Sequence, residues 1–333
     1  MNAISTFREM FRFDDWSRDL LLDAASRLDD AQLDRPLEIG CGSIRTTLIH
    51  LHEAQLWWVW MCMGEEATEP PASESIDALQ ARWRETAARR DAWLDSSDES
   101  VMAGPVEFTD RAGAARSHPV SDVLLHVINH GAHHRAQANN MLRQLGAAPC
   151  RVDYIFMRFQ SPAAPAMSGR ILRDFYAYCD WAQAKVLASA RLLSDAQLDR
   201  TFDMGIGTLR TTLAHITAAE RWWFGNWKEG STIFFPNKET SISIDELVKE
   251  HESVAAARDA FIARLSDDDL SRRVDAQPRK DVLASFPLGQ TMVQLCCHGT
   301  YHRAQALNML RHAGAEPMRM DYLVMCKEKS LRA

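Results

Sequence analysis

Six histidines, in two sets of three with the same spacing, are the residues best suited to do chemistry. The first set is His50, His130 and His134, and the second set is His215, His298 and His302. In each set, two histidines lie four residues apart, so on a helix they project from the same face one turn apart. Three imidazoles from two facing helices can converge on a divalent cation and leave one coordination position for water or substrate. The spacing therefore predicts two open metal sites.

Recurrence in both halves of the chain favours these histidines as ligands, because a single H-x-x-x-H pair on a helix often arises by chance. The other histidines have no histidine at the equivalent position of the other half. They are His52, His118, His126, His133, His251 and His312. Only the two sets of three are thus kept in both halves.

The predicted metal is a divalent transition metal. Imidazole nitrogen suits Zn, Ni, Cu and Fe, and we expect Zn first and Ni second. A di-iron carboxylate bundle would require Glu-x-x-His pairs. The sequence contains no such pair, so that class is excluded.

An internal duplication places the two sets of histidines. Residues 30–60 return 165 positions later with 16 of 31 identical, and residues 130–157 return 168 positions later with 18 of 28 identical. Such identity indicates a tandem duplication of one domain, and a chain of 333 residues is long enough for two domains. We expect domains at residues 1–160 and 161–333, joined where Pro, Ala and Ser replace the periodic pattern.

Apolar periodicity predicts four helices in each copy, and the second and fourth of them carry the histidines. The predicted ranges are 3–28, 44–64, 74–97 and 119–145, then 168–193, 209–228, 243–265 and 288–313. In each copy a Gly-x-Gly turn precedes Ser43 or Thr208, which predicts an N-cap for the second helix. Residues 106–109 and 282–286 could form small strands. The expected fold is all-α, with two tandem four-helix bundles.

The arrangement resembles the DinB family of metal-dependent bundle proteins. The resemblance lies in one histidine on the second helix and H-x-x-x-H-R-x-Q on the fourth, at His130–Gln137 and His298–Gln305, and it covers essentially the whole chain. It implies a DinB-type bundle that holds a metal on the three histidines of each copy. It also implies a monomer whose halves pack as a pseudo-twofold dimer. The family includes enzymes that use low-molecular-weight thiols, so a small-molecule substrate and a thiol cofactor are expected.

Glu53 is the candidate general base, because it follows His50 by three residues and shares its helix face. Ala218 stands at the equivalent position, so the two copies would differ chemically. Gln137 and Gln305 could orient an imidazole. The first functional hypothesis is an enzyme that uses a metal-activated thiol or water for thiol-dependent transfer or hydrolysis. The alternative is a non-catalytic protein that binds or senses a metal or small ligand.

Charge and composition exclude several partners. The chain has 38 Lys and Arg against 45 Asp and Glu, a formal charge of -7, which repels nucleic acid and anionic membranes. No apolar run is long enough for a membrane span, and the first residues lack the apolar stretch of a signal peptide, so we expect a cytoplasmic protein. Seven cysteines without a C-x-x-C pair suggest neither a disulfide framework nor a zinc ribbon.

Overall fold

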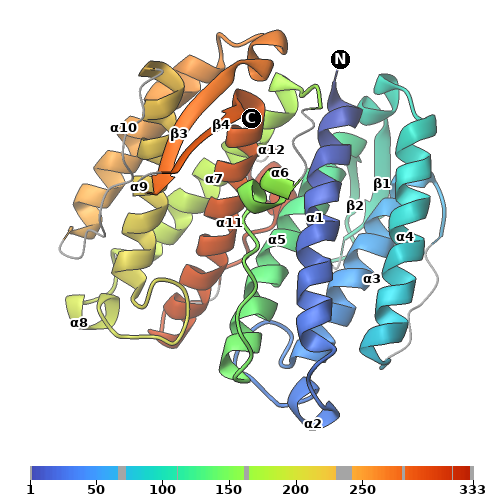
Figure 1. Ribbon diagram of the computed structural model, residues 1–333, viewed down its shortest axis with the longest axis horizontal. Helices are drawn as coiled ribbons and strands as arrows, with labels where there is room; N and C mark the ends of the chain where they lie inside the picture. The colour runs from blue at the N-terminus through green and yellow to red at the C-terminus, as the bar shows by residue number, and fades with distance from the viewer. Residues whose placement is uncertain are drawn as a thin grey trace. The chain divides into compact units, whose positions relative to one another are not determined.

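The chain folds into helices with two short β-hairpins, and about 70% of it is helical (Figure 1). The computed structural model describes residues 2–66, 73–110, 112–160, 165–229, 242–279, 282–316 and 318–330. Contacts divide it into two compact units. The first comprises the residues up to Val152 and the segment from Asp321, and the second comprises Asp153–Met320. The predicted all-α fold with two tandem four-helix bundles is confirmed.

The first unit is a bundle of four long helices. They are α1 (Ala3–Ala25), α3 (Ile44–Met63), α4 (Ile76–Ser96) and α5 (Val120–Gln144). The shorter elements are α2 (Asp30–Leu33), the 3-10 helix η1 (Glu99–Ala103), β1 (Pro105–Thr109), β2 (Ala115–Pro119) and α12 (Tyr322–Ser330). Strands β1 and β2 pair antiparallel, with Val106 opposite His118. The Ser43 hydroxyl accepts from Thr46 N, which confirms the predicted N-cap of α3.

The second unit repeats this plan. Its long helices are α7 (Gly169–Ala190), α9 (Leu209–Glu229), α10 (Ile244–Ile262) and α11 (Leu288–His312). Its shorter elements are α6 (Tyr154–Gln160), α8 (Asp195–Leu198), the 3-10 helix η2 (Asp268–Ser271), β3 (Arg273–Arg279) and β4 (Val282–Pro287). All eight long helices lie within a few residues of their predicted ranges. The suggested strand segments belong to β1 and β4, whereas their partners β2 and β3 were not predicted.

Apolar side chains from all four long helices meet in the core of the first unit. Leu21, Leu48, Trp83 and Leu142, one from each helix, are at most 2% exposed. Burial of each such side chain contributes roughly 1.5–3 kcal/mol relative to leaving it in water. The amphipathic spacing that predicted the helices therefore also fixes which faces meet. Among the described helices, none has both the length and the apolar character that crossing a membrane requires.

Each unit includes a short helix that follows the other copy in the sequence. Helix α6 follows the first copy but packs on α11, where Ile155 N donates to Gln294 Oε1 at 2.9 Å. Helix α12 ends the second copy but packs on α5, where the Tyr322 hydroxyl donates to Asp122 Oδ1 at 3.3 Å. The predicted junction after residue 160 adjoins residues 161–164, which lie outside the described residues, and stays a prediction.

A buried arginine fixes the loop before the second long helix in each unit. In the second unit, Arg210 donates to Asp199 at 2.7 Å, to Asp195 at 2.5 Å and to the Ile242 carbonyl at 3.1 Å. In the first unit, Arg45 makes the same contacts with Asp34, Asp30 and the Glu74 carbonyl. These contacts explain why D-A-Q-L-D and R-T-T-L recur together. They hold the short helix α2 or α8, and the segment before α4 or α10, against the start of α3 or α9.

Arg210→Met is expected to lower the free energy of unfolding of the second unit by about 2 kcal/mol, because it removes a buried cation that makes four hydrogen bonds to three residues. The control is Asp245→Asn, which breaks the Arg191–Asp245 ion pair between two side chains that are more than half exposed. The control should change stability by less than about 0.5 kcal/mol. Urea denaturation measures both, and equal effects would contradict the anchoring role of Arg210.

Candidate metal centre

The first triad converges inside the first unit. His50 comes from α3, and His130 and His134 come from successive turns of α5. The His50 ring centroid lies 5.0 Å from that of His130 and 4.8 Å from that of His134, and the last two are 4.4 Å apart. His50 Nε2 lies 3.2 Å from His130 Nε2. Two helices distant in sequence thus bring three imidazoles to one point.

The second triad has nearly the same geometry. His215 comes from α9, and His298 and His302 come from α11. The three ring centroids are 5.0, 4.8 and 4.5 Å apart, and His215 Nε2 lies 3.0 Å from His298 Nε2. Each ring offers a nitrogen within 4.8 Å of the others. The structure therefore brings all six predicted histidines together in two clusters of three.

These separations fit one cation per triad. A tetrahedral zinc ion with Zn–N bonds of 2.0–2.1 Å places two ligand nitrogens about 3.3 Å apart. The observed Nε2–Nε2 separations of 3.2 and 3.0 Å are close to that value. Two facing nitrogens can share one proton, or both can direct their lone pairs at a cation. The third imidazole of the cluster favours the second arrangement, because a cation can bind all three rings.

In the second unit, hydrogen bonds orient two of the rings. His298 Nδ1 lies 3.0 Å from Asp153 Oδ1, and His302 Nδ1 lies 2.8 Å from Gln305 Oε1. Carboxylate and amide oxygens only accept hydrogen bonds, so each Nδ1 carries a proton and Nε2 is the ring atom left to face a cation. Such partners fix the tautomer and raise the basicity of a ligating imidazole. Burial raises the pKa of Asp153, but the hydrogen bond and charge of His298, with smaller contributions from His302 and Gln294, together outweigh burial and lower it.

In the first unit, the surroundings of the triad are different. Gln137 Nε2 faces His133 Nε2 at 2.9 Å. Burial lowers the pKa of His133 and of His126, and the Asp321 charge opposes that shift. The His126 ring lies 5.7 Å from that of His130. The first cluster thus extends to five imidazoles, whereas Gln294 and Tyr301 occupy the equivalent positions in the second unit.

Burial disfavours the charged form of three of the triad imidazoles. The pKa values of His130, His134 and His302 lie well below 6.5, chiefly because burial disfavours the charged ring and also because neighbouring imidazoles repel a proton. Uncharged imidazole is the form that ligates metals. These three rings therefore favour the form that can bind a cation.

In each copy, the first glycine of the Gly-x-Gly turn lies so close to the glutamine beside the triad that a Cβ would crowd it. Gly205 has a φ of +55°, and a Cβ placed on it would lie 3.1 Å from Gln305 Oε1 and 3.0 Å from Met309 Cε. Gly40 lies equally close to Gln137. Glycine is required there both by the left-handed backbone and by the close approach.

Glu53, the predicted general base, lies half-buried on α3. Burial raises its pKa, while the Arg82 charge lowers it and the Glu74 charge raises it. Among the contacts of the described residues, no hydrogen bond or ion pair joins Glu53 to a triad histidine. Its carboxylate does raise the pKa of the Cys41 thiol, so it lies near the Gly-x-Gly turn.

Two residues that the sequence analysis did not assign now stand beside the triads. Cys41 forms a possible ligand group with His50 and His134, with its ligand atoms within 4.8 Å of theirs. Asp153 orients His298. A cysteine within Gly-x-Gly was a visible signal for the first. For the second, the repeated Asp-Tyr pair gave no indication that Asp153 would reach the other copy's histidines.

Two further groups could hold a cation. They are His118, Asp122 and Cys326 in the first unit and Asp180, Glu220 and His251 in the second. In the latter, Arg258 already donates to both carboxylates. The buried guanidinium makes a second cation there unfavourable.

Comparison with known proteins agrees with this arrangement. A sequence model of the DinB family matches the chain twice, over residues 1–166 and 167–329. The chain is also similar to Protein DinB of Bacillus subtilis (strain 168), with 22% identity over 166 residues. The alignment covers 47% of this chain and 96% of that protein. One relative thus corresponds to one copy of the duplicated domain.

The metal-free protein is expected to lose stability as the pH falls below about 6.5. The unfolded chain takes up protons near that pH, whereas the folded triads resist protonation because their pKa values are depressed. The slope should approach about 1.4 kcal/mol per pH unit for each such imidazole. Urea denaturation with a chelator, from about pH 8 to pH 5, measures it. His130→Gln should reduce the dependence of stability on pH. A wild-type stability that does not change with pH would contradict the depressed pKa values of the triad histidines.

Gly205→Ala and Gly207→Ala separate backbone strain from crowding of Gln305. Both glycines have positive φ, so each substitution should cost about 1–2 kcal/mol of stability. Only Gly205 has side chains within 4 Å of an added Cβ. Gly205→Ala should therefore also weaken zinc binding by the second triad roughly tenfold, by disturbing the Gln305–His302 hydrogen bond. Calorimetric titration tests this, and equal affinities in the two variants would refute it.

Proposed function

The chain belongs to the DinB family, and from that premise we propose that each unit binds one divalent transition metal on its three histidines and uses it on a small-molecule substrate. Zinc is the favoured metal and nickel the second. The observation that carries the proposal is the convergence of three imidazoles in each unit, with two Nε2 atoms 3.2 Å apart in one and 3.0 Å apart in the other.

The chemistry follows from an open three-histidine set. Such a cation supplies a Lewis acid that lowers the pKa of a coordinated thiol or water. Asp153 and Gln305 hold the protons on the Nδ1 atoms of His298 and His302 and so direct both Nε2 atoms to one point. Thiol-dependent transfer and hydrolysis are the two reactions that we propose.

The two units need not perform the same reaction. In the first unit, the ligand atom of Cys41 lies within 4.8 Å of those of His50 and His134, and a cysteine ligand added to the three histidines would close the site. Ile206 stands at the equivalent position of the second unit and offers no ligand atom. We therefore assign catalysis first to the second unit. Glu53 remains the candidate base of the first unit only.

A non-catalytic role in metal or small-ligand binding is the second candidate. The observation that favours it is Ala218, which leaves the second unit without a counterpart of Glu53. In either role we expect a cytoplasmic protein without a nucleic-acid or membrane partner, because the net charge is -7.

Elemental analysis of untagged protein, purified without added metal, tests the metal assignment. We expect one zinc or nickel ion per triad, loss of one ion in His130→Ala and in His298→Ala, and loss of both in the double variant. Asp153→Asn should weaken binding at the second triad about 10- to 100-fold. Its control is Asp321→Asn, because Asp321 acts on His126 and His133 and should matter less to the first triad.

Activity is then tested with pairs of thiols and electrophiles and with hydrolysable substrates. Any turnover by the wild type should fall at least about 100-fold in His298→Ala. Cys41→Ser should weaken metal binding by the first unit alone. Protein without bound metal, or metal content unchanged in both triad variants, would refute the proposal. Turnover that survives loss of both triads would refute its catalytic part.

A further inference from the structure

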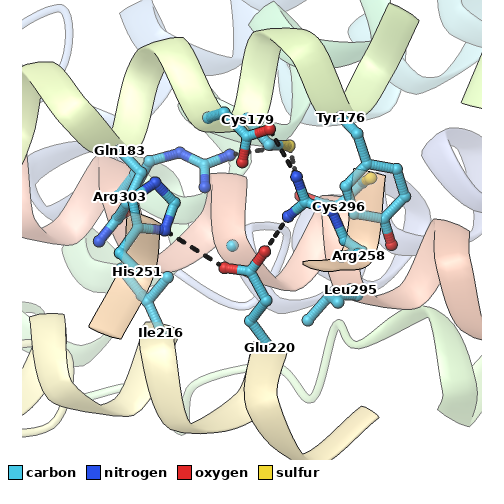
Figure 2. A pocket seen from close by; sticks show the side chains of 12 residues that line it. Tyr176, Cys179, Gln183, Ile216, Glu220, His251, Arg258, Leu295, Cys296 and Arg303 are labelled. Atoms are coloured by element: carbon cyan, nitrogen blue, oxygen red, sulfur yellow. Dashed lines mark hydrogen bonds and ion pairs between the residues drawn. The ribbon is translucent and has the colours of Figure 1, made fainter. Parts of the chain in front are cut away.

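A small polar cavity lies within the second unit, between α7, α9, α10 and α11 (Figure 2). Its volume is about 20 Å³, which is room for one or two water-sized molecules. Cys296, Gly299 and Arg303 border it from the face of α11 next to the one that carries His298 and His302. The cavity is therefore distinct from the proposed metal centre.

Arg303 is buried without a carboxylate partner among the described residues. Its guanidinium donates to Cys179 Sγ at 3.2 Å and to Thr300 Oγ1 at 2.9 Å. The two carboxylates nearby, Asp180 and Glu220, accept from Arg258 instead. Arginine stays charged in proteins, and a buried charge is costly unless it is paired. The Cys179 sulfur is therefore the ionisable group that Arg303 contacts directly.

In the first copy, a carboxylate occupies the position that is equivalent to Cys179. Arg135 is the equivalent of Arg303, and it forms a buried ion pair with Asp14. Asp14 is the equivalent of Cys179, since the two lie 165 residues apart in matching helices. The arginine is thus repeated in both copies, but its partner is a thiol in the second copy and a carboxylate in the first.

A second thiol adjoins the first. Cys296 borders the same cavity, and Cys179 Sγ lies 3.9 Å from the Cys296 carbonyl oxygen. Burial by itself raises the pKa of Cys179, but the contact with Cys296 and the Arg303 charge outweigh burial and lower the pKa to about 7. The two cysteines therefore lie side by side in the interior.

The cavity also presents an unsatisfied amide. Gln183, which is 1% exposed, borders the cavity, and neither its amide nitrogen nor its amide oxygen has a hydrogen-bond partner (Figure 2). Burial of such a group without partners costs free energy. A guest that both donates and accepts hydrogen bonds, and that has very few heavy atoms, would satisfy it.

We propose that Cys179 is a nucleophilic thiolate that reacts with hydrogen peroxide admitted to this cavity, and that Cys296 resolves the product. The thiolate sulfur bonds to one peroxide oxygen while the O–O bond breaks. The leaving hydroxide takes a proton and becomes water, so Cys179 is oxidised to a sulfenic acid and the peroxide is reduced. The Cys296 sulfur then bonds to the Cys179 sulfur, the S–O bond breaks, and hydroxide leaves with the Cys296 proton as a second water.

Limited peroxide treatment of the full chain, followed by peptide mass spectrometry, tests the proposal. The wild type should form a Cys179–Cys296 disulfide, and Cys296→Ser should instead accumulate a sulfenic acid at Cys179, trapped with a 1,3-dione. Oxidation at Cys179 should be roughly tenfold or more faster than at Cys62, whose pKa burial raises to about 12. Oxidation of Cys179 no faster than that of Cys62 would overturn it.

Cys179→Asp is the matched variant, because it restores the carboxylate that pairs with arginine in the first copy and so should fold. In this variant Cys296 should resist peroxide, and equal oxidation of Cys296 there would contradict its role as the resolving thiol. A bulky aromatic disulfide tests the size limit of the cavity. It should react with the exposed Cys41 before Cys179, and the opposite order would refute access through a small cavity.

Discussion

Imidazoles crowded into a bundle interior are the constraint on which the rest of the structure depends. Ring nitrogens 3.0–3.2 Å apart cannot all be protonated, and burial removes the water that would stabilise their charge. The long helices must therefore hold the rings rigidly while other groups fix their protons. Asp153 and Gln305 do this in the second unit, and the repeated glycine turn presses on Gln305 from behind.

Duplication has kept the triads but changed what surrounds them. The first copy places Cys41 and extra histidines beside its triad, whereas the second has Ile206 and a carboxylate on His298. A buried arginine is likewise repeated, yet its anion is Asp14 in one copy and Cys179 in the other. The repeated helices thus hold the histidines in place, while the groups around them differ between the copies.

Helix positions followed from local information, since a buried helix face requires apolar residues at the helical period. Ser43 and its glycine turn predicted the start of α3 correctly for the same reason. Strands β2 and β3 escaped prediction because strands of five to seven residues leave little periodic signal. The positions of α6 and α12 escaped it because the sequence of a short helix does not indicate which longer helix it packs on. Glu53 was predicted beside His50, and the charged groups that act on it are Arg82 and Glu74.

The sequence alone determined the duplication, the eight long helices and the six histidines, because repeats, periodicity and residue spacing are properties of the chain itself. Tertiary structure alone decided that the rings meet within hydrogen-bonding distance, that Asp153 serves histidines of the other copy, and that Cys179 faces Arg303. The physical reason is that pKa values, ligand geometry and charge pairing depend on distances across helices. Packing of all four helices sets those distances, and no local segment of the chain encodes them.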